Sequence, residues 1–309
     1  MSNLEFTIPI PPENFKSGFV AIVGRPNVGK STLMNHLIGQ KVAITSPVAQ
    51  TTRNRLRGIL TTPEAQIIFV DTPGIHKPHH ELGKVLVQNA KTAIKSVDLV
   101  LFVVDSSIEA GTGDRFIFDL LKHSSTPVVL GLNKIDLQPK NYQFIDDSYQ
   151  ELIGDTNWSI IKFSATTGEG TDKLQTTLIN KLETGPYYYP PDLVTDQPER
   201  FIMAELIREQ ILLQTRQEIP HSVAITIEKV EETPKITKIY AAINIERSSQ
   251  KGILIGKQGN MLKEIGVAAR QQIQKLISGK VYLELFVKVE PKWRQSRLRL
   301  AEFGYRVEQ

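Results

Sequence analysis

Short apolar runs alternate with amphipathic stretches along the first 183 residues. Five runs are apolar on both faces, which is typical of strands buried on both sides of a mostly parallel sheet: 19–23, 65–70, 99–104, 127–132 and 159–164. Helical spacing occurs between them, near 31–39, 81–95, 113–123, 141–153 and 170–183. Residues 54–60 alternate between polar and apolar positions, which favours an edge strand. The alternation of strands and helices predicts a doubly wound α/β domain.

Residues 184–198 (TGPYYYPPDLVTDQP) interrupt this pattern, because four prolines and three tyrosines favour an extended connector. The pattern beyond it differs: a helix to about 214, alternating strands at 222–230 and 236–245, a helix near 260–278, a strand at 281–289 and a short basic helix after Pro291. This order predicts a smaller α+β domain. The predicted organisation is a flexible tail at 1–15, a first domain at 16–184, a linker at 185–197 and a second domain at 198–309.

Composition narrows the chemistry. The 309 residues include no cysteine, which excludes disulfides, thiol nucleophiles and thiolate metal sites and suggests a reducing compartment. Without a recognisable leader or an apolar run long enough for a bilayer, a cytoplasmic location is expected. The net charge is +4, and residues 247–299 concentrate it, with 12 basic residues against three acidic ones. Such an imbalance indicates a nucleic-acid partner only if a binding motif accompanies it.

One glycine-rich segment has the chemistry of a phosphate-binding loop. Residues 24–31 (GRPNVGKS) match G-x-x-x-x-G-K-[ST] between a predicted buried strand and a predicted helix. Glycines let backbone N–H groups face phosphate oxygens, and the helix N-terminus adds positive charge. Lys30 is expected to neutralise the β- and γ-phosphates, and the Ser31 hydroxyl to bind Mg²⁺. The predicted phosphate-binding residues are Gly24, Arg25, Pro26, Asn27, Val28, Gly29, Lys30, Ser31 and Thr32.

Two segments have the positions expected of loops that sense the γ-phosphate. The first is Asp71-Thr72-Pro73-Gly74, which follows a buried strand. Asp71 is placed to hold Mg²⁺ through water, and the Gly74 N–H to bond the γ-phosphate. The second is residues 43–52, where a threonine can bind Mg²⁺ when GTP is present. Thr52 is the first choice and Thr51 the second, and solvated loop threonines are the alternative.

Another pair of segments predicts which base the nucleotide carries. Residues 133–136 (NKID) follow a predicted strand, and an aspartate at position 136 can accept hydrogen bonds from guanine N1–H and N2–H₂, which adenine lacks. Asn133 would hold the loop and reach N7, and the Lys134 stem would cover the ring. Ser164-Ala165 ends the next strand, and the Ala165 N–H can bond guanine O6. Ligands of open α/β sheets bind at this carboxyl edge.

Over residues 17–184, these segments resemble the translation-factor-related GTPases with phosphate loops. Many members have glutamine after the DxxG glycine to orient water, whereas this chain has Ile75, so other groups must position the water. Asn27 resembles the asparagine that helps hold K⁺ in some members, and a plain turn residue is the alternative. Slow intrinsic hydrolysis, raised by a partner, is therefore expected. His76, His79 and His80 lack a carboxylate framework, so a solvated loop is expected there.

A second motif lies inside the basic region. Gly256-Lys257-Gln258-Gly259 stands between an apolar stretch and an amphipathic helix, and resembles the GxxG loop of a type II KH domain, which clamps single-stranded nucleic acid. Ile253, Ile255 and Ile265 could line the groove or pack in the core. The predicted RNA-binding residues are Lys251, Ile255, Gly256, Lys257, Gln258, Gly259 and Lys263, with further phosphate contacts from Lys288, Lys292, Arg294, Arg297 and Arg299.

The combination of motifs, with the stretches GRPNVGKSTLMN, AQTTR, YYYPPDLVTD, IGKQG and LELFVKVEPKW, resembles the Era family of GTPases over nearly the whole chain. The resemblance implies binding of small-subunit ribosomal RNA near its 3′ end, a role in assembly of that subunit, and peripheral contact with the inner face of the cytoplasmic membrane. A monomer is expected, and DNA is not an expected partner. The alternatives are a GTPase of tRNA metabolism or of the membrane, and an RNA-binding protein with little GTPase activity.

Overall fold

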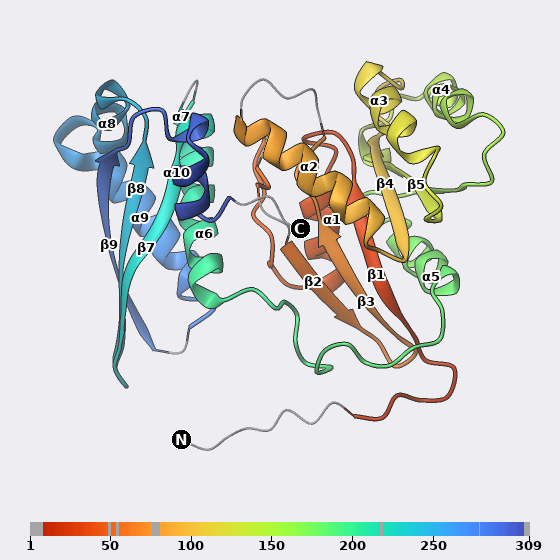
Figure 1. The fold of residues 1–309 in the computed structure, drawn as a ribbon, viewed down its shortest axis with the longest axis horizontal. Coiled ribbons are helices and arrows are strands. Elements are labelled where there is room, and N and C mark those ends of the chain that lie inside the picture. The colour runs from red at the N-terminus through yellow and green to blue at the C-terminus, as the bar shows by residue number, and fades with distance from the viewer. Residues whose placement is uncertain are drawn as a thin grey trace.

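Six strands form the sheet of the first domain (Figure 1). The computed structural model describes residues 9–48, 51–53, 56–75, 81–216, 219–277 and 279–305. The strands are β1 (Lys16–Val23), β2 (Leu56–Thr61), β3 (Ala65–Asp71), β4 (Leu99–Asp105), β5 (Val128–Asn133) and β6 (Ser159–Lys162). Their order across the sheet is β2-β3-β1-β4-β5-β6, and all neighbours run parallel except β2, which is antiparallel to β3.

Helices cover both faces of this sheet, as Figure 1 shows. They are α1 (Lys30–Ile38), α2 (Glu81–Lys95), α3 (Thr112–Leu121), α4 (Gln143–Ile153) and α5 (Thr171–Lys181), with a short 3₁₀ turn η1 (Ile135–Leu137). Side chains alternate along a strand, so Ile22 packs against α1 and α5 on one face, whereas Val23 packs against the helices of the other face. The double burial of each strand explains its apolar runs and confirms the predicted doubly wound domain.

The second domain has the predicted α+β layout. Its elements are α6 (Glu199–Gln214), α7 (Ile219–Ser222), β7 (Ala224–Glu232), β8 (Ile236–Ile245), α8 (Ser248–Ile255), η2 (Lys257–Gly259), α9 (Asn260–Ile273), β9 (Lys280–Val289), η3 (Trp293–Gln295) and α10 (Arg297–Glu302). The sheet order is β7-β8-β9, with β7 antiparallel and β9 parallel to β8. Helices α6, α8 and α9 bury one face of this sheet.

The connector between the domains binds along the first sheet. The Tyr187 ring lies 4.3 Å from the ring of Phe15, which is fully buried although sequence reasoning assigned it to a flexible tail. Gln66 accepts hydrogen bonds from two backbone N–H groups of the tyrosine run. The N–H of Ile59, in the edge strand β2, donates to the carbonyl of Val194 at 2.8 Å. The connector therefore pairs with the edge of the sheet. Residues 1–8 lie outside the described residues.

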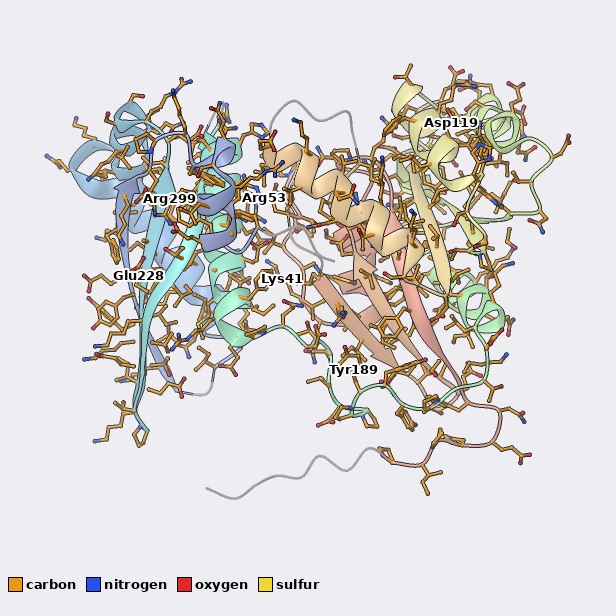
Figure 2. All side chains as sticks on the ribbon, in the orientation of Figure 1. Lys41, Arg53, Asp119, Tyr189, Glu228 and Arg299 are labelled. Atoms are coloured by element: carbon orange, nitrogen blue, oxygen red, sulfur yellow. The ribbon has the colours of Figure 1, made fainter. Side chains whose placement is uncertain are left out.

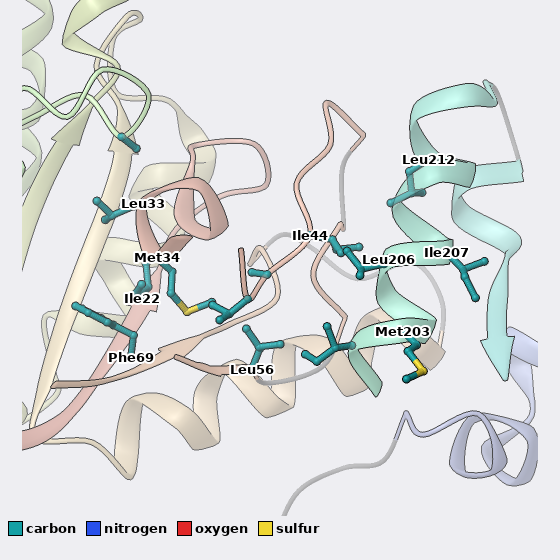
Figure 3. Packing of buried hydrophobic residues seen from close by; sticks show 14 of the residues in the cluster. Ile22, Leu33, Met34, Ile44, Leu56, Phe69, Met203, Leu206, Ile207 and Leu212 are labelled. Atoms are coloured by element: carbon teal, nitrogen blue, oxygen red, sulfur yellow. The ribbon is translucent and has the colours of Figure 1, made fainter. Parts of the chain in front are cut away.

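The two domains share one cluster of buried apolar side chains. Figure 3 shows Ile44 of the first domain facing Leu206 of α6, and the same cluster includes Leu56 and Met203. Among the described residues, no helix is both long and apolar enough to span a membrane.

Candidate functional site

The phosphate loop connects the end of β1 to the start of α1. Lys30 is buried, and its Nζ donates to the carbonyls of Gly24 (3.2 Å) and Arg25 (2.9 Å). Burial lowers the pKa of Lys30 to about 8, although the nearby Asp71 carboxylate opposes the shift. A buried ammonium that is held only by carbonyl oxygens gains strongly from the arrival of phosphate charge.

Two glycines keep this loop accessible to a ligand. A side chain at Gly74 would place its Cβ 2.7 Å from the backbone nitrogen of Pro26, so only glycine allows the 71–74 segment to approach the phosphate loop so closely. Gly29 has a φ of +99°, and its added Cβ would lie 2.3 Å from Asn133 Nδ2. The close approach leaves backbone N–H groups near one small cleft, lined by the phosphate loop, residues 44–46, residues 51–52 and Gly74.

Three oxygen-bearing side chains converge at the helix end of this cleft. Ser31 Oγ donates to Asp71 Oδ2 at 2.7 Å, Thr52 Oγ1 donates to the same oxygen at 3.1 Å, and the two hydroxyls are 3.0 Å apart. The other carboxylate oxygen, Asp71 Oδ1, is buried and has no hydrogen-bond partner among the described residues. Burial raises the pKa of Asp71, which Lys30 and the two hydroxyls oppose. Hydroxyl and carboxylate oxygens are the ligands that Mg²⁺ prefers.

The two candidate threonines point in different directions. Thr51 Oγ1 donates to the Val48 carbonyl at 2.7 Å and lies 2.7 Å from Ser46 Oγ, so its hydroxyl is held within its own loop. Thr52 is the one that reaches Ser31 and Asp71. Of the two alternatives left open by the sequence, the geometry favours Thr52.

The predicted guanine-binding residues follow β5 and β6 at the same edge of the sheet. Asn133 is buried, its Nδ2 donates to the Val28 carbonyl at 2.7 Å, and its Oδ1 accepts from the Ala165 N–H at 2.9 Å. Lys134 Nζ pairs with Asp105 Oδ2 at 2.6 Å. Asp136 is exposed. Asn133 thus joins three loops, and Asp136 presents a carboxylate to solvent beside them.

Several predicted residues serve the loop through their backbones, because their side chains are bound elsewhere. Arg25 pairs with the buried Asp114 of α3 at 2.8 Å, and Val28 packs in the core. Thr72 Oγ1 donates to the Ile22 carbonyl at 2.8 Å. Ile75 is buried in one of the two apolar clusters that flank the sheet, so its side chain does not face the cleft. Of the remaining predicted positions, Pro26 and Thr32 line the cleft, whereas Pro73 and Ser164 are buried, and Ser164 Oγ accepts from the Thr167 N–H at 3.1 Å.

Asn27 contacts the other side of the cleft. Its Nδ2 donates to the Pro47 carbonyl at 2.8 Å, and its φ of 64° is unusual for a residue other than glycine. The side chain thus reaches the segment that leads to Thr52. His76, His79 and His80 lie outside the described residues.

The GxxG loop stands between α8 and α9. Gly256, Gln258 and Gly259 all have positive φ angles (71°, 53° and 81°), and a Cβ at Gly256 would lie 2.7 Å from that of Met261. Lys251, Lys257, Gln258 and Lys263 are exposed around it, and Ile255 is partly buried. The turn therefore presents backbone and lysine ammonium groups to solvent.

A groove of about 420 Å³ begins at this loop and runs between α9 and the free edge of β9. It is lined by Gly259, Leu262, Lys263, Gly266, Val267, Arg270, Tyr282, Leu283, Glu284 and Leu285. Ile265, which sequence reasoning offered as a groove residue or a core residue, is fully buried in the core. The groove wall supplied by β9 was missed, because its neighbour relationship to α9 is not local in the sequence.

Part of the basic run at the end of β9 and beyond it is neutralised by carboxylates. Lys288 pairs with Glu228 at 3.0 Å, Arg294 with Glu246, and Arg299 with Glu302 at 2.7 Å. Lys292 and Arg297 are exposed, and Arg297 lies 3.7 Å from Glu81. The predicted phosphate contacts of this run thus face competition from bound carboxylates, in contrast to the lysines of the GxxG loop.

Sequence reasoning also missed a contact between the domains beside Thr52. Arg53 is buried, and its Nη1 and Nη2 donate to the carbonyls of Val223 (2.6 Å) and Pro220 (2.9 Å) in the second domain. Its guanidinium lies 6.0 Å from the Trp293 ring and 5.8 Å from the Tyr305 ring. Figure 2 shows Arg53 where the two domains face each other. No local pattern in the sequence identifies such a residue, and Arg53 was quoted only as part of the AQTTR segment.

Comparison with known families matches residues 19–134 to the family described as 50S ribosome-binding GTPase, and residues 218–294 to the KH domain. Curated relatives are similar over the whole chain. GTPase Era of Crocosphaera subtropica is 76% identical over 98% of this chain and 96% of its own length. GTPase Era of a Nostoc species is 72% identical, over 99% and 94% respectively.

Solved structures agree. A crystal structure of Era in complex with MgGDPNP and nucleotides 1506–1542 of 16S ribosomal RNA has a TM-score of 0.91 and 41% identity, covering 94% of this chain and 99% of that one. A variant of Era from Aquifex aeolicus bound to GDP and AlF₄⁻ has a TM-score of 0.90, with the same identity and the same coverage of both chains.

Proposed function

The chain belongs to the Era family of GTPases, and from this premise we propose that it hydrolyses GTP to control the binding of small-subunit ribosomal RNA. Its KH domain binds that RNA near the 3′ end, and the GTPase assists assembly of the small subunit and maturation of its RNA. One observation carries the proposal. A relative similar over 94% of this chain was crystallised with both a GTP analogue and 16S nucleotides, and this chain has a phosphate loop and a GxxG groove.

The phosphate and guanine sites divide the work of holding GTP. The phosphate loop with Lys30 binds the phosphates, and Asp136 selects guanine through its N1–H and N2–H₂ groups. Asn133 acts mainly as a scaffold, because both ends of its amide are occupied by Val28 and Ala165. Lys134, Ser164 and Ala165 complete the base site.

Mg²⁺ fits the oxygens of Ser31, Thr52 and Asp71. Their clustering and the unpartnered Asp71 Oδ1 support this assignment. When bound, the ion supplies positive charge to the β- and γ-phosphates. K⁺ beside Asn27 is a further part of the proposal and rests on the family resemblance of this residue.

Hydrolysis is slow until a partner acts, because Ile75 stands where many GTPases orient water and its side chain is in the core. Loss of the γ-phosphate frees the loops at 43–52 and 71–80 from the nucleotide, and the contacts of Thr45 and Thr51 with α6 of the second domain then change how the GxxG groove meets RNA. RNA binding and GTP hydrolysis are thereby linked.

The test measures binding of a 16S 3′-end RNA fragment with a non-hydrolysable GTP analogue and with GDP, and phosphate release from GTP with and without that RNA. We expect tighter binding with one nucleotide and faster release with RNA. Equal affinities contradict the coupling, since a ligand shifts a switch only through differential binding. A DNA fragment of the same sequence is the control and should bind more weakly.

The same assays separate the alternatives. RNA binding without phosphate release indicates an RNA-binding protein with little GTPase activity, and preference for tRNA over the 16S fragment indicates a role in tRNA metabolism. Peripheral membrane contact and a monomeric state stay predictions from the family resemblance. Sedimentation with anionic vesicles and the mass in solution test them.

A further inference from the structure

Thr52 and Arg53 are adjacent, and their side chains leave the backbone toward different domains. Thr52 Oγ1 reaches Ser31 and Asp71 in the nucleotide cleft. Arg53 reaches the carbonyls of Val223 and Pro220 in the second domain. In an extended segment, successive side chains point to opposite sides, so fixing one of the two positions restricts the other.

The Arg53 side chain has a specific seat in the second domain. Its guanidinium is fully buried, pairs with no carboxylate within ion-pair distance among the described residues, and lies beside the rings of Trp293 and Tyr305, which stack on each other with their centroids 5.8 Å apart. Burial lowers the pKa of Arg53. Two carbonyl acceptors at 2.6 and 2.9 Å and the two nearby aromatic rings offset part of the cost of burying this cation, whose Nε has no hydrogen-bond partner among the described residues. A planar guanidinium can make these contacts together, whereas a lysine cannot.

Helix α6 holds the same loop at two more points. Glu209 Oε1 accepts from the Thr45 N–H at 2.9 Å, and Arg208 Nη2 donates to the Thr51 carbonyl. Both α6 residues are buried. Both neighbours of Thr52 are therefore bound to the second domain, Thr51 through its carbonyl and Arg53 through its side chain.

We propose that Arg53 is a positioning residue for GTP hydrolysis, which holds Thr52 at the metal site by anchoring the end of switch I, the loop at 43–52, to the KH domain. This rests on the proposed role of Thr52 as a Mg²⁺ ligand. The KH domain thus completes the GTPase site. Because coupling is reciprocal, Mg²⁺ and GTP bound by Thr52 also favour the seating of Arg53 beside Trp293. GDP needs no γ-phosphate contact from switch I, so its affinity does not depend on Arg53.

The test compares Arg53→Gln with Thr52→Ala and with Arg57→Gln as the matched control. Arg57 lies four positions on and pairs with Asp196 of the connector at 2.7 Å, away from the KH domain. We measure single-turnover GTP hydrolysis, the Mg²⁺ concentration at half-maximal rate, and GDP affinity. Arg53→Gln is expected to slow hydrolysis about 10-fold, within the range typical of coupled sites, and to raise the Mg²⁺ midpoint. GDP affinity should stay within about twofold, because the phosphate and base sites are intact.

The outcomes separate the two ideas. Wild-type hydrolysis and Mg²⁺ dependence in Arg53→Gln, with slow hydrolysis in Thr52→Ala, overturn the positioning role and leave the proposed function intact. Wild-type behaviour in Thr52→Ala instead overturns the assignment of Thr52 to Mg²⁺.

A second measurement keeps Arg53 in place and does not require Arg53→Gln to fold. Trp158→Phe leaves Trp293 as the single tryptophan, against which Arg53 lies. The emission of Trp293 should differ between the GTP analogue with Mg²⁺ and GDP with Mg²⁺. Identical emission in the two states overturns the proposal.

Discussion

Asn133 Nδ2 lies 2.7 Å from the carbonyl oxygen of Val28, and this hydrogen bond ties the loop after β5 to the phosphate loop. The same side chain accepts the Ala165 N–H, so one buried amide spans three loops that contact different parts of a nucleotide. The base site and the phosphate site are therefore one rigid unit.

Asn133→Ala removes both bonds and leaves a buried carbonyl and a buried N–H without their partners. We expect the free energy of unfolding to fall by about 2 kcal/mol or more, since each unsatisfied group costs about 1–3 kcal/mol. GTP and GDP affinities should fall together, because both ligands use the same loops. Thermal unfolding and nucleotide titration measure the two effects, and a loss confined to GTP would contradict the scaffold role.

Asp136→Asn should change the base that is bound. The carboxylate is replaced by an amide, which can donate to a 2-oxo group but no longer accepts both guanine donors. GTP affinity is expected to fall by about 1–3 kcal/mol, the value of a bidentate base contact, while xanthosine triphosphate binds better than before. Competition binding measures both. Asp172→Asn, at an exposed position of α5, is the control and should leave the base preference unchanged.

We expect His221 to make the folded protein less stable in mild acid. Burial lowers its pKa from 6.5, with help from the Arg53 and Arg294 charges. Below pH 6.5 His221 is protonated in the unfolded chain but still neutral in the folded chain. The free energy of unfolding therefore falls as the pH drops from 6.5 toward the lower pKa of the folded state. His221→Gln should flatten this part of the profile, which urea unfolding from pH 7 to pH 5 measures. An unchanged slope in the variant would place the dependence elsewhere.

Lysines of the GxxG loop should contribute more to RNA affinity than paired basic residues. Lys257 is exposed and has no ion pair among the described residues, whereas Lys288 is paired with Glu228. The logarithm of RNA affinity falls as the logarithm of salt concentration rises. Lys257→Ala is expected to make this fall shallower by about 0.7 in slope, the value of one single-strand phosphate contact. Lys288→Ala is the matched control with a smaller change. Equal changes in slope would show that the carboxylate does not withhold Lys288 from RNA.

Sequence reasoning succeeded where the signal is local. Strands buried on both faces have apolar runs whatever their neighbours are, and the order of strands and helices follows from those runs. Residues 54–60 were predicted as an edge strand from alternation alone, and β2 lies at the edge of the sheet. The phosphate and guanine motifs are short because they bind through one turn of backbone each.

Sequence reasoning was less informative where the role of a residue depends on contacts with residues far away in the sequence. The sequence ranked Thr52 before Thr51 without excluding either, and the positions of Ser31 and Asp71 favour Thr52. Arg53 contacts residues about 170 positions away, beyond the reach of any periodicity. The sequence predicted phosphate contacts along the whole basic run, because the carboxylates that pair with Lys288 and Arg294 come from other elements.

The connector beside β2 has a consequence for handling the protein. An open sheet edge offers unpaired backbone groups to any other chain, which is a route to aggregation. Here Val194 accepts the Ile59 N–H, and Thr195 Oγ1 donates to the Arg57 carbonyl, so the connector acts as a cover strip along that edge. A GTPase fragment cut at residue 184 would expose the edge and tend to self-associate, whereas one cut after Gln197 would keep it covered and stay dispersed.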